Sequence, residues 1–478
     1  MESYKLDEND INASHPLANI LPEPIQFKVG TDTPMLDSVT IDLLIKERVT
    51  KRERTKPYYH FKKVIEDFPV PTEIKLNFIQ RSRYYNIAVN LTYKQIAKAL
   101  FRKYTRLLLK KNDSKLGESD HRESSAHDAV HQFVPILAPR DAIGNEVIAM
   151  REALRQLRYN SEVYVETFHP EMLQECRKFT EYKNCTDNDV VVYHFASYSP
   201  LADFFQSLDA KKILVYHNVT PYKSFIGIND RAFESSKNAR EQLYELRNCV
   251  DLTIAHSEYS KMELEEIGFR NVVVAPVFLN FDKYSAKLNE NLHSRHSNSV
   301  NILYVGRIAP HKKIEDLLKI FAYYHNCINN DSKLFVVGSA IGMERYYIWL
   351  RRLVRKSKLR NVHFVKNASD QDLATYFNLA DLYVSMSEHE GFCIPLVESM
   401  YFGVPVVAYD CSAIPDTLGN AGIRVKEKKF EEIAEMLDAV LSDNDLRNEV
   451  IRKQNERLNE IRQHNIQDVF TRYVREVC

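Results

Sequence analysis

The sequence lacks the features that mark several common protein classes. No apolar run approaches the roughly 20 residues that span a bilayer, and residues 1–15 are polar and acidic, unlike a secretory signal. The 65 basic and 65 acidic residues give a formal net charge of zero, so composition offers no argument for a nucleic-acid partner. We therefore expect a cytoplasmic protein that is soluble or lies on a membrane surface.

The sequence also lacks a recognisable metal or disulfide pattern. Its seven cysteines are odd in number and widely spaced, without a CxxC pair or a Cys/His cluster, so we expect free thiols in a reducing compartment. Asp-x-Asp pairs occur at 187–189, 370–372 and 443–445. The last two pairs stand where helices are expected to begin, and helix capping explains them. We predict no metal and no cofactor.

Residues 1–128 differ from the rest of the chain and are predicted to form an N-terminal extension. The extension begins polar and proline-interrupted and then becomes basic, with a charge run at 45–56 that is typical of a solvated or flexible segment. Apolar residues at helical spacing predict a helix over 91–111, whose charged residues are all basic. This helix could bind an anionic membrane surface, or its apolar stripe could pack on the domain that follows.

From about residue 131, short apolar runs alternate with helical patterns, which predicts a parallel sheet covered on both faces. The first series of runs lies at 133–137, 163–167, 189–195, 213–217, 252–256 and 271–277, with a helix expected after each of the first two runs. After a polar stretch, a second series lies at 301–306, 333–338, 361–365, 381–386 and 404–409.

This restart predicts two α/β domains. We place the first over 129–290 and the second over 291–460, with a hinge near 285–299. A charged amphipathic helix over 446–478 has no following strand, and we expect residues 461–478 to pack back on the first domain.

Ligands of open α/β sheets bind outside the carboxyl ends of the strands, and residues 305–313 follow such an end. Gly306 ends a predicted strand and permits close backbone approach. Arg307 and Lys312 lie in the turn that opens the next helix, where two cations and helix N–H groups suit a diphosphate. The alternative is a solvated basic turn.

A second candidate segment spans residues 387–400. Glu390 is expected in a loop and Glu398 in the first turn of the next helix, with Gly391 and Phe392 shaping the loop between them. Carboxylates accept hydrogen bonds strongly, so one could hold sugar hydroxyls and the other a ribose. Alternatively, Glu398 only complements the helix dipole.

The first domain contributes two weaker candidates. Gly144 lies near a helix start whose N–H groups could bind a phosphate, whereas Asp141 could simply cap that helix. His217 ends a predicted strand, where an imidazole could meet a ligand or serve as a core or capping residue.

Together these segments resemble the group-1 (family 4) retaining glycosyltransferases of the GT-B fold, over roughly residues 131–460. The turn at 305–313 matches the family's Gly-Arg…Lys pattern, residues 390–398 match its Glu-x7-Glu motif, and residues 397–408 continue that match. The resemblance implies catalytic roles for His217, Arg307, Lys312 and Glu390, and substrate-binding roles for Asp141, Gly144, Asn145, Gly306, Gly391, Phe392 and Glu398.

The resemblance further implies two facing Rossmann-like domains behind a partly helical extension. It implies retaining transfer from a nucleotide-diphosphate sugar to a glycan or lipid-linked glycan, with no metal at the leaving diphosphate. Cell-surface polysaccharide or lipopolysaccharide assembly is the expected setting. A non-catalytic GT-B scaffold subunit and a nucleotide-sugar epimerase are the alternatives.

Overall fold

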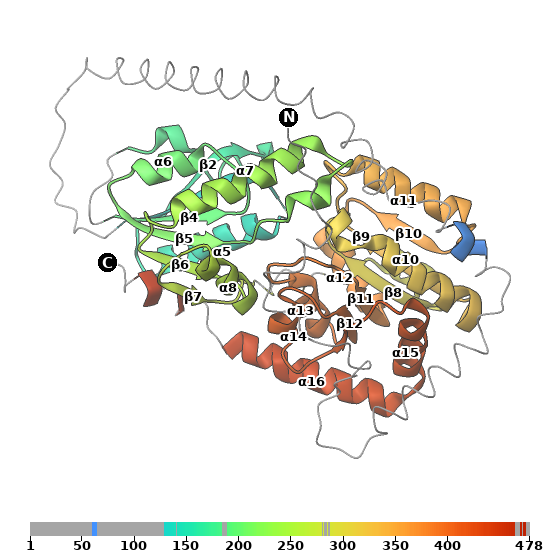
Figure 1. Cartoon of the computed structure of the whole chain (residues 1–478). Coiled ribbons are helices and arrows are strands. Elements are labelled where there is room, and N and C mark those ends of the chain that lie inside the picture. Colours follow the sequence, from blue (N-terminus) through green and yellow to red (C-terminus); the bar gives the residue numbers. More distant parts are fainter. Residues whose placement is uncertain are drawn as a thin grey trace, which may run out of the picture.

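A computed structural model describes residues 60–64, 129–139, 141–183, 189–279, 281, 284, 287–463, 469–470 and 472–474. These residues form two α/β domains, each built on its own parallel sheet, that face each other (Figure 1). The predicted fold class is therefore confirmed. The predicted helix at 91–111 and the charge run at 45–56 lie outside the described residues.

The first sheet has seven parallel strands in the order β3-β2-β1-β4-β5-β6-β7. They are β1 (Val130–Leu137), β2 (Val163–Phe168), β3 (Arg177–Lys178), β4 (Val190–Phe195), β5 (Lys211–Tyr216), β6 (Leu252–Ala255) and β7 (Val272–Val274). Every residue of β4 is buried, as a central strand of a parallel sheet covered on both faces requires. The covering helices are α5 (Ala142–Gln156), α6 (Leu201–Ser207), α7 (Asp230–Leu246) and α8 (Glu258–Glu266).

The sequence predicts a helix after β2, but this prediction is wrong: the described residues 169–183 form no α-helix. This segment instead contains two 3-10 turns, Pro170–Met172 and Phe179–Glu181, separated by β3. The segment follows the sheet edge because β3 pairs with β2 and because the Phe179 and Tyr182 rings pack on the core of this sheet.

The second sheet has six parallel strands in the order β10-β9-β8-β11-β12-β13. They are β8 (Val300–Val305), β9 (Ser332–Val337), β10 (Val362–Val365), β11 (Leu382–Ser385), β12 (Val406–Tyr409) and β13 (Ile423–Val425). The five predicted runs correspond to β8 to β12. The sequence analysis missed β13, because it is three residues long and has Arg424 at its centre.

The helices of the second domain are α9 (Glu290–His296), α10 (Ile314–Tyr323), α11 (Glu344–Lys356), α12 (Asp370–Leu379), α13 (Ile394–Tyr401), α14 (Ile414–Leu418), α15 (Phe430–Ser442) and α16 (Asn444–Gln463). The polar stretch predicted as a hinge contains α9. Asn289 caps this helix and its amide donates to the Asp372 carboxylate of α12 at 2.8 Å, so the stretch is held on the second domain.

From β1 onward, the chain passes between the domains twice. The first passage follows β7: Ala275 packs in the core of the first domain, whereas the Tyr284 phenol bonds Glu398 of the second. The second passage follows α16, which packs on the second domain through Leu458. Beyond it, the buried side chains of Phe470, Tyr473 and Val474 join the core of the first domain, and the short red helical pieces in Figure 1 lie beside that domain.

The described part of the N-terminal extension contacts the second domain. Residues 60–64 are helical, and Phe61 packs in the second-domain core. Among all helices that the structure describes, none combines the length and apolarity needed to cross a bilayer.

Candidate functional site

Two glycines at neighbouring strand ends bring the basic turn into place. Gly306 follows β8 with φ 152°, and Gly338 follows β9 with φ 151°. A Cβ atom on Gly338 would lie 1.9 Å from the Gly306 carbonyl oxygen, so only glycine allows this contact. The two turns therefore touch, and the Arg307 guanidinium donates to the Ile341 carbonyl at 3.1 Å.

The two predicted motifs of the second domain meet in an ion pair. Lys312 ends a 3-10 turn, Pro310–Lys312, and its Nζ lies 2.6 Å from Glu390 Oε2, with side-chain exposures of only 15% and 11%. The Glu390 N–H donates to Ser412 Oγ at 2.9 Å, which fixes the loop after β11. One cation and one carboxylate of the expected site are thus adjacent at the carboxyl edge of the sheet.

Glu398 lies deeper at the same edge. Because α13 begins at Ile394, Glu398 stands in the second helical turn, and its predicted place in the first turn is wrong. Its buried carboxylate accepts a hydrogen bond from the Tyr284 phenol, so it does more than complement the helix dipole. Burial raises the pKa of Tyr383 well above its ordinary value, and the Glu390 and Glu398 carboxylates add to this rise.

The start of α5 in the first domain faces the basic turn of the second. Asp141 caps α5 by accepting a hydrogen bond from the Gly144 N–H at 3.1 Å. This is the contact that the helix-capping alternative predicts. Burial raises the pKa of Asp141, and the positive charge of Arg307 opposes that rise. Asp141, Asn145 and Arg307 are all exposed. Solvent thus reaches side chains that protein also surrounds, as expected for a site between two domains.

The loop after β11 contacts the first domain directly. A Cβ atom on Gly391 would lie 3.0 Å from the carbonyl oxygen of His217 and 3.0 Å from Asn218 Cβ. Glycine at 391 therefore permits close approach of the two domains. The side chain of Phe392 turns the other way, into the core of the second domain, so it anchors this loop.

Further contacts between the domains flank this approach. Asn229 Nδ2 donates to the Gly342 carbonyl at 2.6 Å, and the Tyr259 N–H donates to Asp416 Oδ2 at 2.9 Å. Phe225 and Ile228 of the first domain pack into the core of the second. None of these residues was selected from the sequence, because their partners lie more than 80 residues away along the chain.

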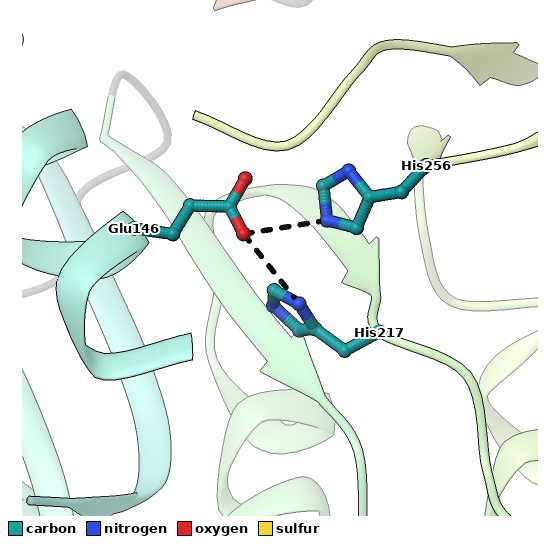
Figure 2. Close-up of side chains that lie close together, drawn as sticks. All are labelled: Glu146, His217 and His256. Carbon is teal, nitrogen blue, oxygen red and sulfur yellow. Dashed lines mark ion pairs between the residues drawn. The ribbon is translucent and has the colours of Figure 1, made fainter. Parts of the chain in front are cut away.

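His217 has its main chain at the interface and its imidazole inside the first domain. It follows β5, and its side chain is 6% exposed. Its Nε2 atom lies 2.9 Å from His194 Nδ1. Its Nδ1 atom lies 3.6 Å from Glu146 Oε2 (Figure 2). The imidazole is therefore placed as the alternative of a core histidine predicts. A catalytic role for His217 stays a prediction.

Most of the second domain is similar in sequence to known proteins. Residues 289–457 match the family model described as glycosyl transferases group 1. This chain carries a group 1 glycosyltransferase domain. Over 147 residues it is 29% identical to the O-antigen chain mannosyltransferase B of Escherichia coli, covering 30% of this chain and 38% of the relative. Over 178 residues it is 29% identical to the capsular polysaccharide biosynthesis glycosyltransferase CapM of Staphylococcus aureus, covering 35% and 44%. The matches thus span less than half of either relative.

Solved glycosyltransferases share the two-domain architecture. Sucrose-phosphate synthase of Thermosynechococcus elongatus superposes with a TM-score of 0.58 at 15% identity, covering 73% of this chain and 99% of that one. Anabaena HepE in complex with UDP and glucose superposes with a TM-score of 0.57 at 14% identity, covering 73% and 100%. Such similarity establishes the GT-B fold.

The group 1 glycosyltransferase domain holds only part of the expected site. Gly306, Arg307, Lys312, Glu390 and Glu398 fall inside the matched range. The first-domain candidates fall outside it, and these are Asp141, Gly144, Asn145 and His217. Their proximity to the second domain therefore rests on the geometry alone.

Proposed function

We propose that the protein is a retaining glycosyltransferase that moves a sugar from a nucleotide-diphosphate sugar to a glycan or a lipid-linked glycan. One observation carries the proposal: Arg307 and the Lys312–Glu390 pair lie at the carboxyl edge of the glycosyltransferase domain, opposite the first domain. Two relatives are named for O-antigen and capsular polysaccharide, which supports a role in cell-surface polysaccharide assembly.

The donor diphosphate would bind Arg307 and Lys312. An arriving diphosphate competes with Glu390 for the Lys312 ammonium, so donor binding releases a carboxylate that can accept hydrogen bonds from hydroxyls of the transferred sugar. Glu398 would hold the ribose after exchanging its bond from the Tyr284 phenol. HepE was solved with UDP and glucose, which supports this class of donor.

Transfer breaks the bond between the anomeric carbon and the diphosphate oxygen. The charge that develops on the leaving oxygen is stabilised by Arg307 and Lys312, which are already in place and need little reorganisation. The acceptor hydroxyl attacks from the same face and passes its proton to the leaving phosphate, so configuration is retained without a covalent nucleophile. Closure of the two domains aligns the reactants and excludes water. In this proposal no metal acts at the leaving diphosphate.

The acceptor would enter from the first domain, past the start of α5. We place the protein in the cytoplasm, with residues 91–111 as the segment that could hold it on an anionic membrane. Flotation with anionic vesicles tests that placement. Wild-type protein should float in a salt-sensitive manner and a variant with neutralised Lys and Arg residues in 91–111 should not. Equal flotation of the two proteins would exclude this segment as the anchor.

Replacement of Arg307 by alanine should lower kcat by about 100- to 1000-fold, because one preorganised charge at the leaving group is lost. The melting temperature should stay nearly unchanged, since the Arg307 side chain is exposed. Release of nucleoside diphosphate in the presence of acceptor measures the rate, after thermal shift with candidate nucleotide sugars has identified the donor. Arg352→Ala removes an exposed arginine of α11 and should retain full activity. Normal turnover of Arg307→Ala would exclude the assigned role.

A further inference from the structure

A cluster of metal-ligating side chains lies inside the first domain. Glu146 comes from α5, His217 follows β5 and His256 follows β6 (Figure 2). Glu146 Oε2 lies 3.5 Å from His256 Nε2 and 3.6 Å from His217 Nδ1, and the three atoms lie within 4.8 Å of one another. Within the described part of the chain, this is the one such group of three.

A chain of hydrogen bonds fixes the tautomer of His217. Gln132 Nε2 donates to the Val147 carbonyl at 3.0 Å, so Gln132 Oε1 must be the acceptor from His194 Nε2 at 2.9 Å. His194 Nδ1 then has no hydrogen and accepts from His217 Nε2 at 2.9 Å. His217 Nδ1 is left with a lone pair that faces Glu146.

His256 and Glu146 are oriented in the same way. His256 Nδ1 lies 3.0 Å from the Ala275 carbonyl, which can only accept, so in the neutral imidazole His256 Nε2 carries a lone pair. Glu146 Oε1 accepts from the Phe278 N–H at 3.1 Å. Glu146 Oε2 and His256 Nε2 are both buried, and neither has a hydrogen-bond partner among the residues that the structure describes.

Three lone pairs thus converge in a buried space, which is costly unless a cation lies between them. A shared proton would draw two of these atoms to about 2.5–3.2 Å, which is shorter than either separation. Ligands bound at about 2.1 Å to a tetrahedral zinc ion lie roughly 3.4 Å apart. The observed separations of 3.5 and 3.6 Å match this spacing. Each ligand also has an outer partner that fixes its orientation, as metal ligands usually do.

We propose that Glu146 Oε2, His217 Nδ1 and His256 Nε2 bind one divalent transition-metal ion. Two imidazoles and one carboxylate form a ligand set that suits Zn²⁺, with water as the fourth ligand. The ion would tie α5 to the ends of β5 and β6, and so hold the start of α5 opposite Arg307. This metal site is separate from the residues proposed to bind the donor diphosphate, and its existence does not depend on the proposed sugar transfer.

Metal analysis of the full-length protein, purified without a histidine tag, tests the site. After chelation, incubation with Zn²⁺ and dialysis, mass spectrometry should find one equivalent of zinc. The melting temperature should rise with Zn²⁺, because the ion binds the folded state. Co²⁺ in its place should give the visible absorption of a four-coordinate centre. A wild-type protein that retains no stoichiometric zinc after this treatment overturns the proposal.

Matched variants distinguish a bound metal ion from a proton shared between two of the three side chains. Glu146→Gln keeps the shape of the side chain and its bond from Phe278, but should weaken zinc binding by more than about 100-fold, since loss of an outer-shell partner alone costs 10- to 100-fold. His256→Gln should do the same. His325→Gln removes a buried imidazole that bonds Ser332 in the second domain and should retain one zinc.

The shared-proton alternative predicts the opposite result for Glu146→Gln. The amide would supply the missing hydrogen, so the variant would melt at or above the temperature of the wild type, and Zn²⁺ would shift neither protein. That outcome overturns the metal site and leaves the proposed sugar transfer standing.

Discussion

The Lys312–Glu390 pair links stability to function at the level of single residues. Both side chains are largely shielded from water, so each charge depends on the other when no donor is bound. Removal of one partner from such a pair leaves an uncompensated charge, whereas removal of both charges costs far less.

Replacement of Lys312 by methionine should therefore lower the free energy of unfolding by about 2 kcal/mol. Adding Glu390→Gln to that variant should restore most of this loss, because the orphan carboxylate is removed. Transfer activity should be lost in both proteins. Urea denaturation of the two single variants and the double variant measures the coupling, and simple additivity of the two changes would contradict a direct pair.

Strand-end positions made part of the site predictable from sequence. Gly306, Arg307, Lys312 and Glu390 could be selected because each follows a recognisable apolar run. Glu146 could not, since it follows no such run. His256 ends the run at 252–256 as His217 ends the run at 213–217, but only the folded sheet brings the three side chains together. The burial of Glu146 in α5, where a charged side chain needs a partner, is seen only in the folded structure.

The contact between Gly306 and Gly338 acts at the level of elements. It sets how closely the ends of β8 and β9 approach, and through them it positions the turn that carries Arg307. The Gly306 oxygen belongs to the backbone, so it cannot move aside for a larger residue at position 338 as the end of a flexible side chain could.

Replacement of Gly338 by alanine should lower the melting temperature by about 10 °C. Positive φ costs an alanine about 1–3 kcal/mol, and the clash with Gly306 adds to this. For a domain of this size each kcal/mol corresponds to about 2–4 °C. Gly403→Ala is the matched control, because Gly403 also has positive φ, at 67°, but a Cβ atom there would have no neighbour within 4 Å in the described part of the chain. It should melt about 3 °C lower than wild type, and equal losses in the two variants would show that the Gly306 contact costs nothing.

Long apolar strands could be predicted from the sequence, whereas very short strands and a short polar helix could not. Strands such as β4 and β9 were found because each contains four consecutive apolar residues, at 190–193 and 334–337, as is typical of a buried parallel strand. The two- and three-residue strands β3 and β13 were missed, because pairing with a neighbour defines them more than their own composition does. The helix α9 was mistaken for a hinge, since its polar sequence hides a short helix held by tertiary contacts.

At the scale of the whole molecule, the chain end fastens one domain to the other. The long helix α16 belongs to the second domain, whereas Phe470 and Val474 fill the core of the first. The stability of the first domain therefore depends on residues that follow the second.

Replacement of Phe470 by alanine should destabilise the first domain by about 3 kcal/mol, because it leaves a cavity in a buried cluster. Hydrogen exchange should locate the loss in β1, α5 and β4 rather than in the second sheet. Arg472→Ala removes an exposed side chain of the same segment and should change stability by less than about 1 kcal/mol. Uniform loss of protection in both domains would contradict a local role for Phe470.

The two covalent passages that follow β7 and α16 also restrict how the domains can move. A single linker would act as a pivot, about which one lobe could swivel in any direction. Two separate linkers define a line, and rotation about that line is the motion that strains neither of them. Opening and closing would then follow one arc that carries Arg307 toward and away from Asp141. Cutting the chain between α16 and Phe470 should widen the range of lobe orientations seen in solution scattering, even if every side chain near Arg307 stays intact.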